Sequence, residues 1–126
     1  MIRVIIPSNF EFKSYEPRLR ELYEENQDKI TDTNTFDFIT RKTFYYCFIN
    51  GGEIIGVIYF FADGDKLFLN AYGPRGHFKE KIECLKLSLS WFGCDIYAEA
   101  QNRASALCLL RAGFERKEGK LFVYKH

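Results

Sequence analysis

The sequence predicts a single domain of mixed α/β class, in which helices cover both faces of a mixed sheet. Three observations support this prediction. β-rich and amphipathic helical runs alternate along the chain, three β-rich runs follow one another in its middle, and helical runs both precede and follow those three. The chain has 126 residues without a linker, a repeat or a low-complexity segment, so we expect one domain over residues 1–126.

A strand and two helices are expected first. Residues 2–6, IRVII, form a β-branched apolar run that is typical of a strand. Residues 14–27 predict a helix with Pro17 in its first turn, where a missing N–H is tolerated. Residues 33–42 predict a second, shorter helix with Thr35 as its N-cap.

Three antiparallel strands are expected between Phe44 and Tyr72. The runs FYYCFI and EIIGVIYFF flank Asn50-Gly51-Gly52, a sequence that favours a tight β-hairpin. The turn ADGD then separates the second run from KLFLNAY. These segments therefore predict a β-meander.

The rest of the chain predicts a loop, two helices and three strands. Residues 73–76 form the loop, and a helix follows whose apolar stripe extends to Phe92, with Gly93 as its C-terminal cap. The run CDIYAEA predicts a strand, and the following helix is bounded by Asn102 as N-cap and Gly113 just past its end. A hairpin around Gly119 completes the predicted order β-α-α-β-β-β-α-β-α-β-β.

Composition argues against several classes of partner. Lys and Arg number 18 and Asp and Glu 17, so a net charge of +1 does not favour binding to nucleic acid or to a membrane surface. The four cysteines form no C-x-x-C pair and only two histidines could assist them, so we expect reduced thiols and no metal site. Neither a signal peptide nor a membrane-spanning run is visible, and a cytoplasmic protein is expected.

The C-terminal third carries a more specific pattern. The strand DIYAEA is followed by Asn102, a short helix with small residues, a basic residue at Arg111, and Gly113-Phe114 before the last hairpin. This pattern, together with the order of elements along the whole chain, resembles the GNAT family of N-acetyltransferases. The resemblance implies a GNAT-like acyl-CoA N-acyltransferase fold, acetyl-CoA as cosubstrate, and transfer of the acetyl group to an amine of a small molecule or a protein.

The resemblance also implies a place for the cofactor. In the family, the loop after the fourth strand holds the pyrophosphate of acetyl-CoA with backbone N–H groups at a helix N-terminus. Here that stretch is GPRGHFKEK, in which Phe78 and Glu80 replace the small residues that the family usually has. The candidate cofactor-binding residues are Tyr72, Gly73, Arg75, Gly76, Lys79 and Asn102.

The catalytic groups are less clear from the sequence. Leu109 stands where many family members have the tyrosine that protonates the leaving thiolate, and a leucine cannot donate a proton. Glu99, at the end of a strand, is the candidate base, with a surface carboxylate as the alternative interpretation.

Two hypotheses of different class therefore remain at this point. The first is an acetyl-CoA-dependent N-acetyltransferase. The alternative is a non-catalytic GNAT-like module that binds a protein or a small molecule, which Leu109, Phe78 and Glu80 favour. An exposed last strand is also compatible with a homodimer.

Overall fold

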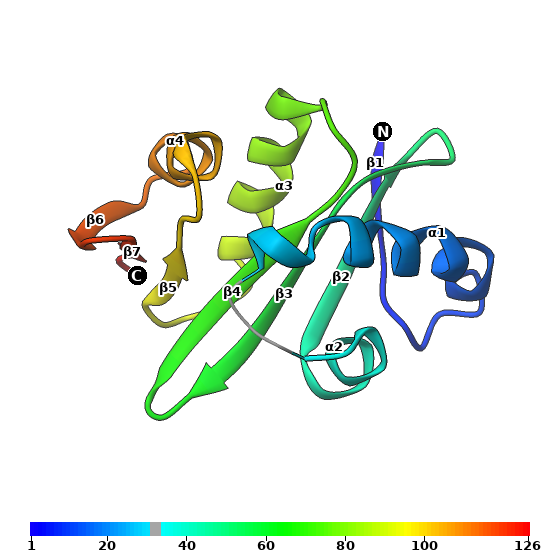
Figure 1. Ribbon diagram of the computed structural model, residues 1–126, viewed down its shortest axis with the longest axis horizontal. Coiled ribbons are helices and arrows are strands. Elements are labelled where there is room, and N and C mark those ends of the chain that lie inside the picture. The colour runs from blue at the N-terminus through cyan, green and yellow to red at the C-terminus, as the bar shows by residue number, and fades with distance from the viewer. Residues whose placement is uncertain (31–33) are drawn as a thin grey trace.

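A mixed sheet forms the centre of the molecule (Figure 1). The computed structural model describes residues 1–30 and 34–126, and over these residues seven strands lie in the order β1-β2-β3-β4-β5-β7-β6. The strands are β1 (Ile2–Ile5), β2 (Phe44–Asn50), β3 (Glu53–Asp63), β4 (Lys66–Tyr72), β5 (Ile96–Glu99), β6 (Glu115–Glu118) and β7 (Leu121–Tyr124). The helices are α1 (Phe12–Glu25), α2 (Phe36–Lys42), α3 (Phe78–Leu89) and α4 (Arg103–Arg111), and a 3₁₀ turn, η1 (Gln27–Lys29), follows α1.

The pairing of β4 with β5 is parallel, whereas the other strand pairs in the described sheet are antiparallel. β4 and β5 share only two register pairs, Leu67 with Ile96 and Phe68 with Tyr97. Beyond them β4 continues to Tyr72 and β5 to Glu99 without pairing to each other. The sheet is therefore open between the carboxyl ends of these two strands.

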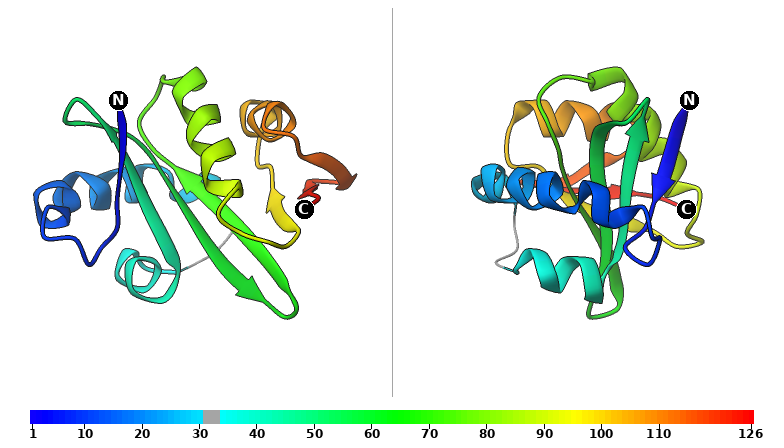
Figure 2. Two further views of the ribbon diagram at one scale, coloured as in Figure 1. Left: turned by 180° about the vertical axis from the view of Figure 1, so that it is seen from behind. Right: turned by 90° about the vertical axis from the view of Figure 1, so that its right-hand side faces the viewer.

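Helices α1 and α2 cover one face of the sheet, and α3 and α4 cover the other. Figure 1 shows α1 and α2 over β1–β4, where they enclose an aromatic-rich core with the strands beneath them. Figure 2 shows the opposite side, where α3 and α4 pack and enclose a second core with β3, β4, β5 and β7. Because the helices lie on both faces, the predicted layer arrangement is confirmed.

Most predicted elements form as the sequence indicates. The predicted order of strands and helices is confirmed, with η1 as an addition. Gly51 and Gly52 both have positive φ, at 59° and 84°, and form the turn between β2 and β3. The Thr35 side chain accepts a hydrogen bond of 3.1 Å from the Phe38 N–H and caps α2. The start of the predicted second helix, Thr33, lies outside the described residues.

The first helix was expected over residues 14–27 and lies two residues earlier at both ends. α1 begins at Phe12, before the predicted start, so Pro17 lies in its second turn rather than its first. Asn9 explains the earlier start, because its side chain accepts from the Glu11 N–H at 2.8 Å and its carbonyl accepts from the Phe12 N–H at 3.0 Å.

The end of α3 also differs from the prediction. The helix ends at Leu89 with Ser90 as C-cap, so Gly93 does not cap it. Trp91 follows in a turn, and Phe92 comes directly after it and packs against Phe60 at 4.4 Å between ring centroids. The apolar stripe thus reaches Phe92, but its last member contacts the core from outside the helix.

Candidate functional site

A cavity of about 290 Å³ lies where β4 and β5 separate. Its lining comes from the carboxyl ends of β4 and β5, the loop after β4, one face each of α3 and α4, residues 55–58 of β3, Phe48 of β2, and the end of α1. The polar side chains in the lining belong to Asn26, Asn70, Tyr72, Arg75, Lys81, Glu99, Gln101 and Ser105, and the thiols to Cys84 and Cys108. Several segments that are far apart in the sequence therefore meet here.

The loop after β4 begins at a glycine that the neighbouring strand requires. A Cβ atom on Gly73 would lie 2.9 Å from the Cα of Gly56 and 3.2 Å from the carbonyl oxygen of Ile55. The register of β2 and β3 shifts at this point, so β3 has a bulge that brings its backbone toward the loop. Asn26, at the end of α1, donates a hydrogen bond of 3.3 Å to the Gly73 carbonyl. The start of the loop is thus held between the backbone of β3 and the end of α1.

Tyr72 precedes this glycine and lines the cavity, but its hydroxyl is engaged elsewhere. It lies 2.5 Å from the hydroxyl of Tyr45, inside the core under α1 and α2. Burial raises the pKa of both phenols, so both remain protonated at neutral pH. Tyr72 thus lines the cavity while its polar end is bound to a second tyrosine.

The N-terminus of α3 faces the same loop. His77 precedes it in the left-handed conformation, with φ of 56°, and no side chain of the described residues caps the helix. Glu80, in the first turn, accepts from Asn50 at 3.0 Å and contacts His77 Nδ1 at 3.0 Å. Hydrogen bonds from Asn50 and then His77 lower the pKa of this carboxyl.

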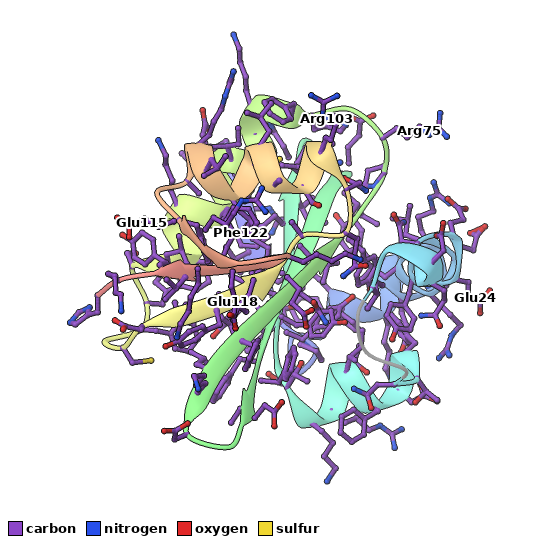
Figure 3. The ribbon with its side chains drawn as sticks, turned by 60° about the vertical axis from the view of Figure 1, so that its left-hand side comes forward. Glu24, Arg75, Arg103, Glu115, Glu118 and Phe122 are labelled. Carbon is purple, nitrogen blue, oxygen red and sulfur yellow. The ribbon has the colours of Figure 1, made fainter. Side chains whose placement is uncertain are left out.

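The predicted cations and Gly76 occupy different positions around the loop. Arg75 lines the rim of the cavity and is exposed, and Figure 3 shows its side chain extending outward. Lys81 also lines the cavity and donates a hydrogen bond to the carbonyl of Pro74, which ties α3 to the loop. Lys79 and Gly76 are exposed and do not line the cavity, and Gly76 supplies a positive φ of 85°.

The ends of α4 follow from its sequence. The Asn102 side chain accepts from the Ser105 N–H at 2.9 Å, and the Asn102 N–H donates to the Ser105 hydroxyl, which together form a capping box. At the other end Gly113, with φ of 105°, donates to the Leu110 carbonyl and Phe114 to the Leu109 carbonyl, as in a Schellman motif. Both predicted boundaries of this helix are confirmed.

One face of α4 forms a wall of the cavity through Ser105, Cys108 and Leu109. This spacing places the three side chains on one side of the helix. Leu109 is buried and apolar, so it provides no proton to the cavity. Burial raises the pKa of the Cys108 thiol, although the positive charges of Lys81 and Arg111 act in the opposite direction.

The site residues predicted from the sequence are brought together only in part. Tyr72, Gly73, Arg75 and Glu99 line the cavity, whereas Gly76, Lys79 and Asn102 lie outside its lining. Phe78, the bulky residue of the loop motif, is partly exposed, and the Arg111 guanidinium lies 5.5 Å from its ring centroid.

Sequence reasoning missed several lining residues, among them Asn26, Gln101 and Ser105. The helical spacing from Ser105 to Leu109 could have revealed Ser105. No local signal marks Asn26, since it reaches the cavity only because α1 ends beside Gly73.

No group of three or more His, Cys, Asp or Glu side chains within residues 1–30 and 34–126 is arranged to hold a metal ion. In the same part of the chain, none of the helices has the length and apolar character needed to cross a membrane.

Comparison by sequence finds no match, since no protein-family model matches the chain and no curated protein matches it. Comparison by structure does find matches. An N-acetyltransferase from Staphylococcus aureus Mu50 superposes with a TM-score of 0.73 at 12% identity, over 99% of this chain and 97% of that one.

Two further matches are structures that contain coenzyme A. The aminoglycoside acetyltransferase AAC(6')-Ib, in complex with coenzyme A and kanamycin, has a TM-score of 0.68 at 12% identity, over 100% of this chain and 95% of that one. The PaiA N-acetyltransferase from Thermoplasma acidophilum, in complex with coenzyme A, has a TM-score of 0.60 at 14% identity, over 100% and 99% of the two chains. At these identities the likeness concerns the fold.

Proposed function

We propose that this chain, which has the fold of the GNAT N-acetyltransferases as its sequence predicted, binds acetyl-CoA in the cavity between β4 and β5 and transfers the acetyl group to an amine. The observation that carries this proposal is the separation of the two parallel strands after Phe68 and Tyr97, directly beside the Gly73–Arg75 loop.

The open edge of β4 suits the amide-containing arm of a CoA thioester. From residue 69 to Tyr72, β4 pairs with β3 but has no register partner on its β5 side among the described residues. An extended ligand with its own amide groups can hydrogen-bond to such an edge as an added strand does. We therefore assign the pantetheine arm to this edge, between β4 and α4.

The loop and the start of α3 suit the phosphates. The helix N-terminus presents N–H groups that no side chain of the described residues caps, and it favours an anion. Arg75 adds a positive charge at the rim, and Lys81 adds one beside the loop carbonyl that it binds. Lys79, Gly76 and Asn102 are outside the lining, so we assign them supporting roles. Lys79 adds positive charge near the loop, Gly76 allows the loop its positive φ, and Asn102 caps α4.

The transfer itself requires few groups from the protein. A neutral amine attacks the thioester carbonyl, a C–N bond forms, and the C–S bond breaks as the CoA thiolate leaves. Glu99, exposed at the end of β5 and in the cavity lining, accepts the proton that the amine loses, directly or through water. Leu109 supplies no proton for the thiolate, so that proton comes from solvent.

A turnover assay tests this function. Release of free CoA from acetyl-CoA is followed with a panel of acceptors, which are small amines and peptides with a free N-terminal amine. The variant is Glu99→Gln, and the control is Glu115→Gln, on β6 outside the cavity. We expect Glu99→Gln to lower turnover about 100-fold without changing the affinity for acetyl-CoA. Equal turnover of the wild type and both variants would remove Glu99 from the mechanism. Tight binding of acetyl-CoA without turnover on any amine would favour the non-catalytic alternative.

Two further assignments belong to this proposal. A cytoplasmic location is expected from the sequence, and fractionation of cells that express the tagged chain tests it. The sequence is compatible with a homodimer through an exposed last strand, but the last strand, β7, is paired on both sides, with β5 and β6. A second copy would therefore pair with β6, the edge strand of the described sheet, and light scattering coupled to size-exclusion chromatography tests for a dimer.

A further inference from the structure

The cavity changes in chemical character from its rim to its inner end. At the rim, Arg75 and Glu99 are exposed and Gln101 and Ser105 are partly exposed, so the opening is polar. The inner end is formed by apolar side chains that are each at most 6% exposed: Phe48, Ile58, Leu69, Leu85, Ala98 and Leu109. The cavity therefore continues from the proposed CoA site into the core between the sheet and α3–α4.

The walls of this inner end contain no charged side chain. Cys84, from α3, completes it and is only 3% exposed. Burial raises the pKa of its thiol to about 12, so the thiol is neutral at physiological pH. An aliphatic group between these side chains would therefore be in van der Waals contact on all sides, whereas a polar group would find no side chain to hydrogen-bond with.

Leu109 contributes to this apolar character directly. It occupies the α4 position that the family resemblance assigns to a tyrosine, and it packs in the same core cluster as Leu85 and Ala98. A tyrosine there would bring a hydroxyl group into the inner end. The leucine removes a proton donor and at the same time leaves an apolar wall beside the expected position of the thioester.

We propose that the inner end of this cavity is an acyl pocket, and that the preferred donor is a CoA thioester with a straight aliphatic acyl group longer than acetyl. This inference rests on the proposed function, since it needs CoA to bind along β4. The acyl chain enters between Leu109 and Cys84, while the carbonyl carbon stays at the gap between the strands, where the amine attacks. The bonds formed and broken are those of acetyl transfer.

Titration calorimetry with CoA, acetyl-CoA and butyryl-CoA tests the acyl pocket. Burial of two additional methylene groups should tighten binding of butyryl-CoA about 15-fold relative to acetyl-CoA. Equal affinities for the two thioesters would overturn the acyl pocket and leave the proposed function standing. Failure of all three ligands to bind would instead overturn the proposed function, so the two failures are distinguishable.

Filling the pocket provides the matched test. Cys84→Leu should reduce the preference for butyryl-CoA to within about twofold of acetyl-CoA, and Lys86→Leu, on the exposed side of the same helix, should retain it. If Cys84→Leu does not fold, Leu109→Phe fills the pocket from α4 and should reduce the preference for butyryl-CoA in the same way. Its control is Leu110→Phe, on the exposed side of α4. A full preference for butyryl-CoA in a folded, filled variant would contradict the assignment.

Discussion

The hydroxyl groups of Tyr45 and Tyr72 lie 2.5 Å apart in the core between the sheet and α1–α2. Each tyrosine is nearly inaccessible to solvent, at 2% and 6% exposed. A single hydrogen bond thus joins the end of β4, which lines the cavity, to β2, two strands away. The relationship is structural, and it leaves the Tyr72 hydroxyl engaged away from any ligand.

A double-mutant cycle on this pair gives the first prediction. We expect Tyr45→Phe and Tyr72→Phe each to lower the free energy of unfolding by about 1–2 kcal/mol, because each leaves a buried hydroxyl without its partner. The double variant should lose about 1 kcal/mol less than the sum of the two. Chemical denaturation measures these values. Strictly additive losses would show that the two hydroxyls do not interact.

The contact between Gly73 and Gly56 gives the second prediction. Gly73→Ala places a Cβ 2.9 Å from the Cα of Gly56, and backbone atoms cannot yield as a flexible side chain can. We expect a loss of about 1–3 kcal/mol of stability. Gly93→Ala is the control, since a Cβ there meets nothing within 4 Å. Similar thermal stability of both variants would show that β3 and the loop are not in this contact.

The capping box of α4 gives the third prediction. Asn102→Ala removes the acceptor for the Ser105 N–H and should lower stability by about 1 kcal/mol, whereas Asn102→Asp retains the cap. Because Asn102 lies outside the cavity lining, the affinity of the folded variants for CoA should change less than twofold. A large loss of CoA affinity in Asn102→Asp with unchanged stability would assign Asn102 to direct ligand contact.

Thiol reactivity gives the fourth prediction. In a Cys94→Ser background, we expect Cys108 to react slowly with iodoacetamide at pH 7, because burial raises its pKa and the thiolate is scarce. The rate of Cys108 alkylation should keep rising with pH even above the pH at which an ordinary cysteine is fully ionised. Saturating CoA should slow the reaction further, since Cys108 lines the cavity.

Cys94 is the control for this experiment. It is exposed and lies outside the cavity, so in a Cys108→Ser background its labelling should not respond to CoA. Fast labelling of Cys108 at pH 7 would contradict its burial in the cavity wall. A labelling rate that CoA does not change would contradict its place beside the ligand.

Features that depend on neighbouring residues were predictable from the sequence. The turn at Gly51-Gly52 and both ends of α4 were predicted and confirmed, because each depends on the local backbone preferences of a few consecutive residues. The start of α1 was not predicted, since Asn9 forms its own turn before the helix without a strong pattern.

The site depends on contacts between distant segments, which explains why it was predicted only in part. Gly73 was predicted to bind the cofactor, and the structure gives a different reason for a glycine at this position, the close backbone of Gly56 on the neighbouring strand. Asn26 reaches the same loop from the end of α1, although Gly73 is 47 positions further along the chain. The apolar inner end likewise combines side chains from β2, β3, β4, β5, α3 and α4.

The central claim is that the gap between β4 and β5 binds acetyl-CoA with its phosphates at the Gly73–Arg75 loop. Calorimetric titration of acetyl-CoA into the wild type, Arg75→Ala and Lys86→Ala tests it most directly, because both variants lose one exposed positive charge and only Arg75 lines the cavity. We predict micromolar binding to the wild type and to Lys86→Ala, and affinity about five- to tenfold weaker for Arg75→Ala. No binding to the wild type at millimolar acetyl-CoA, or equal affinities for all three proteins, would contradict the account.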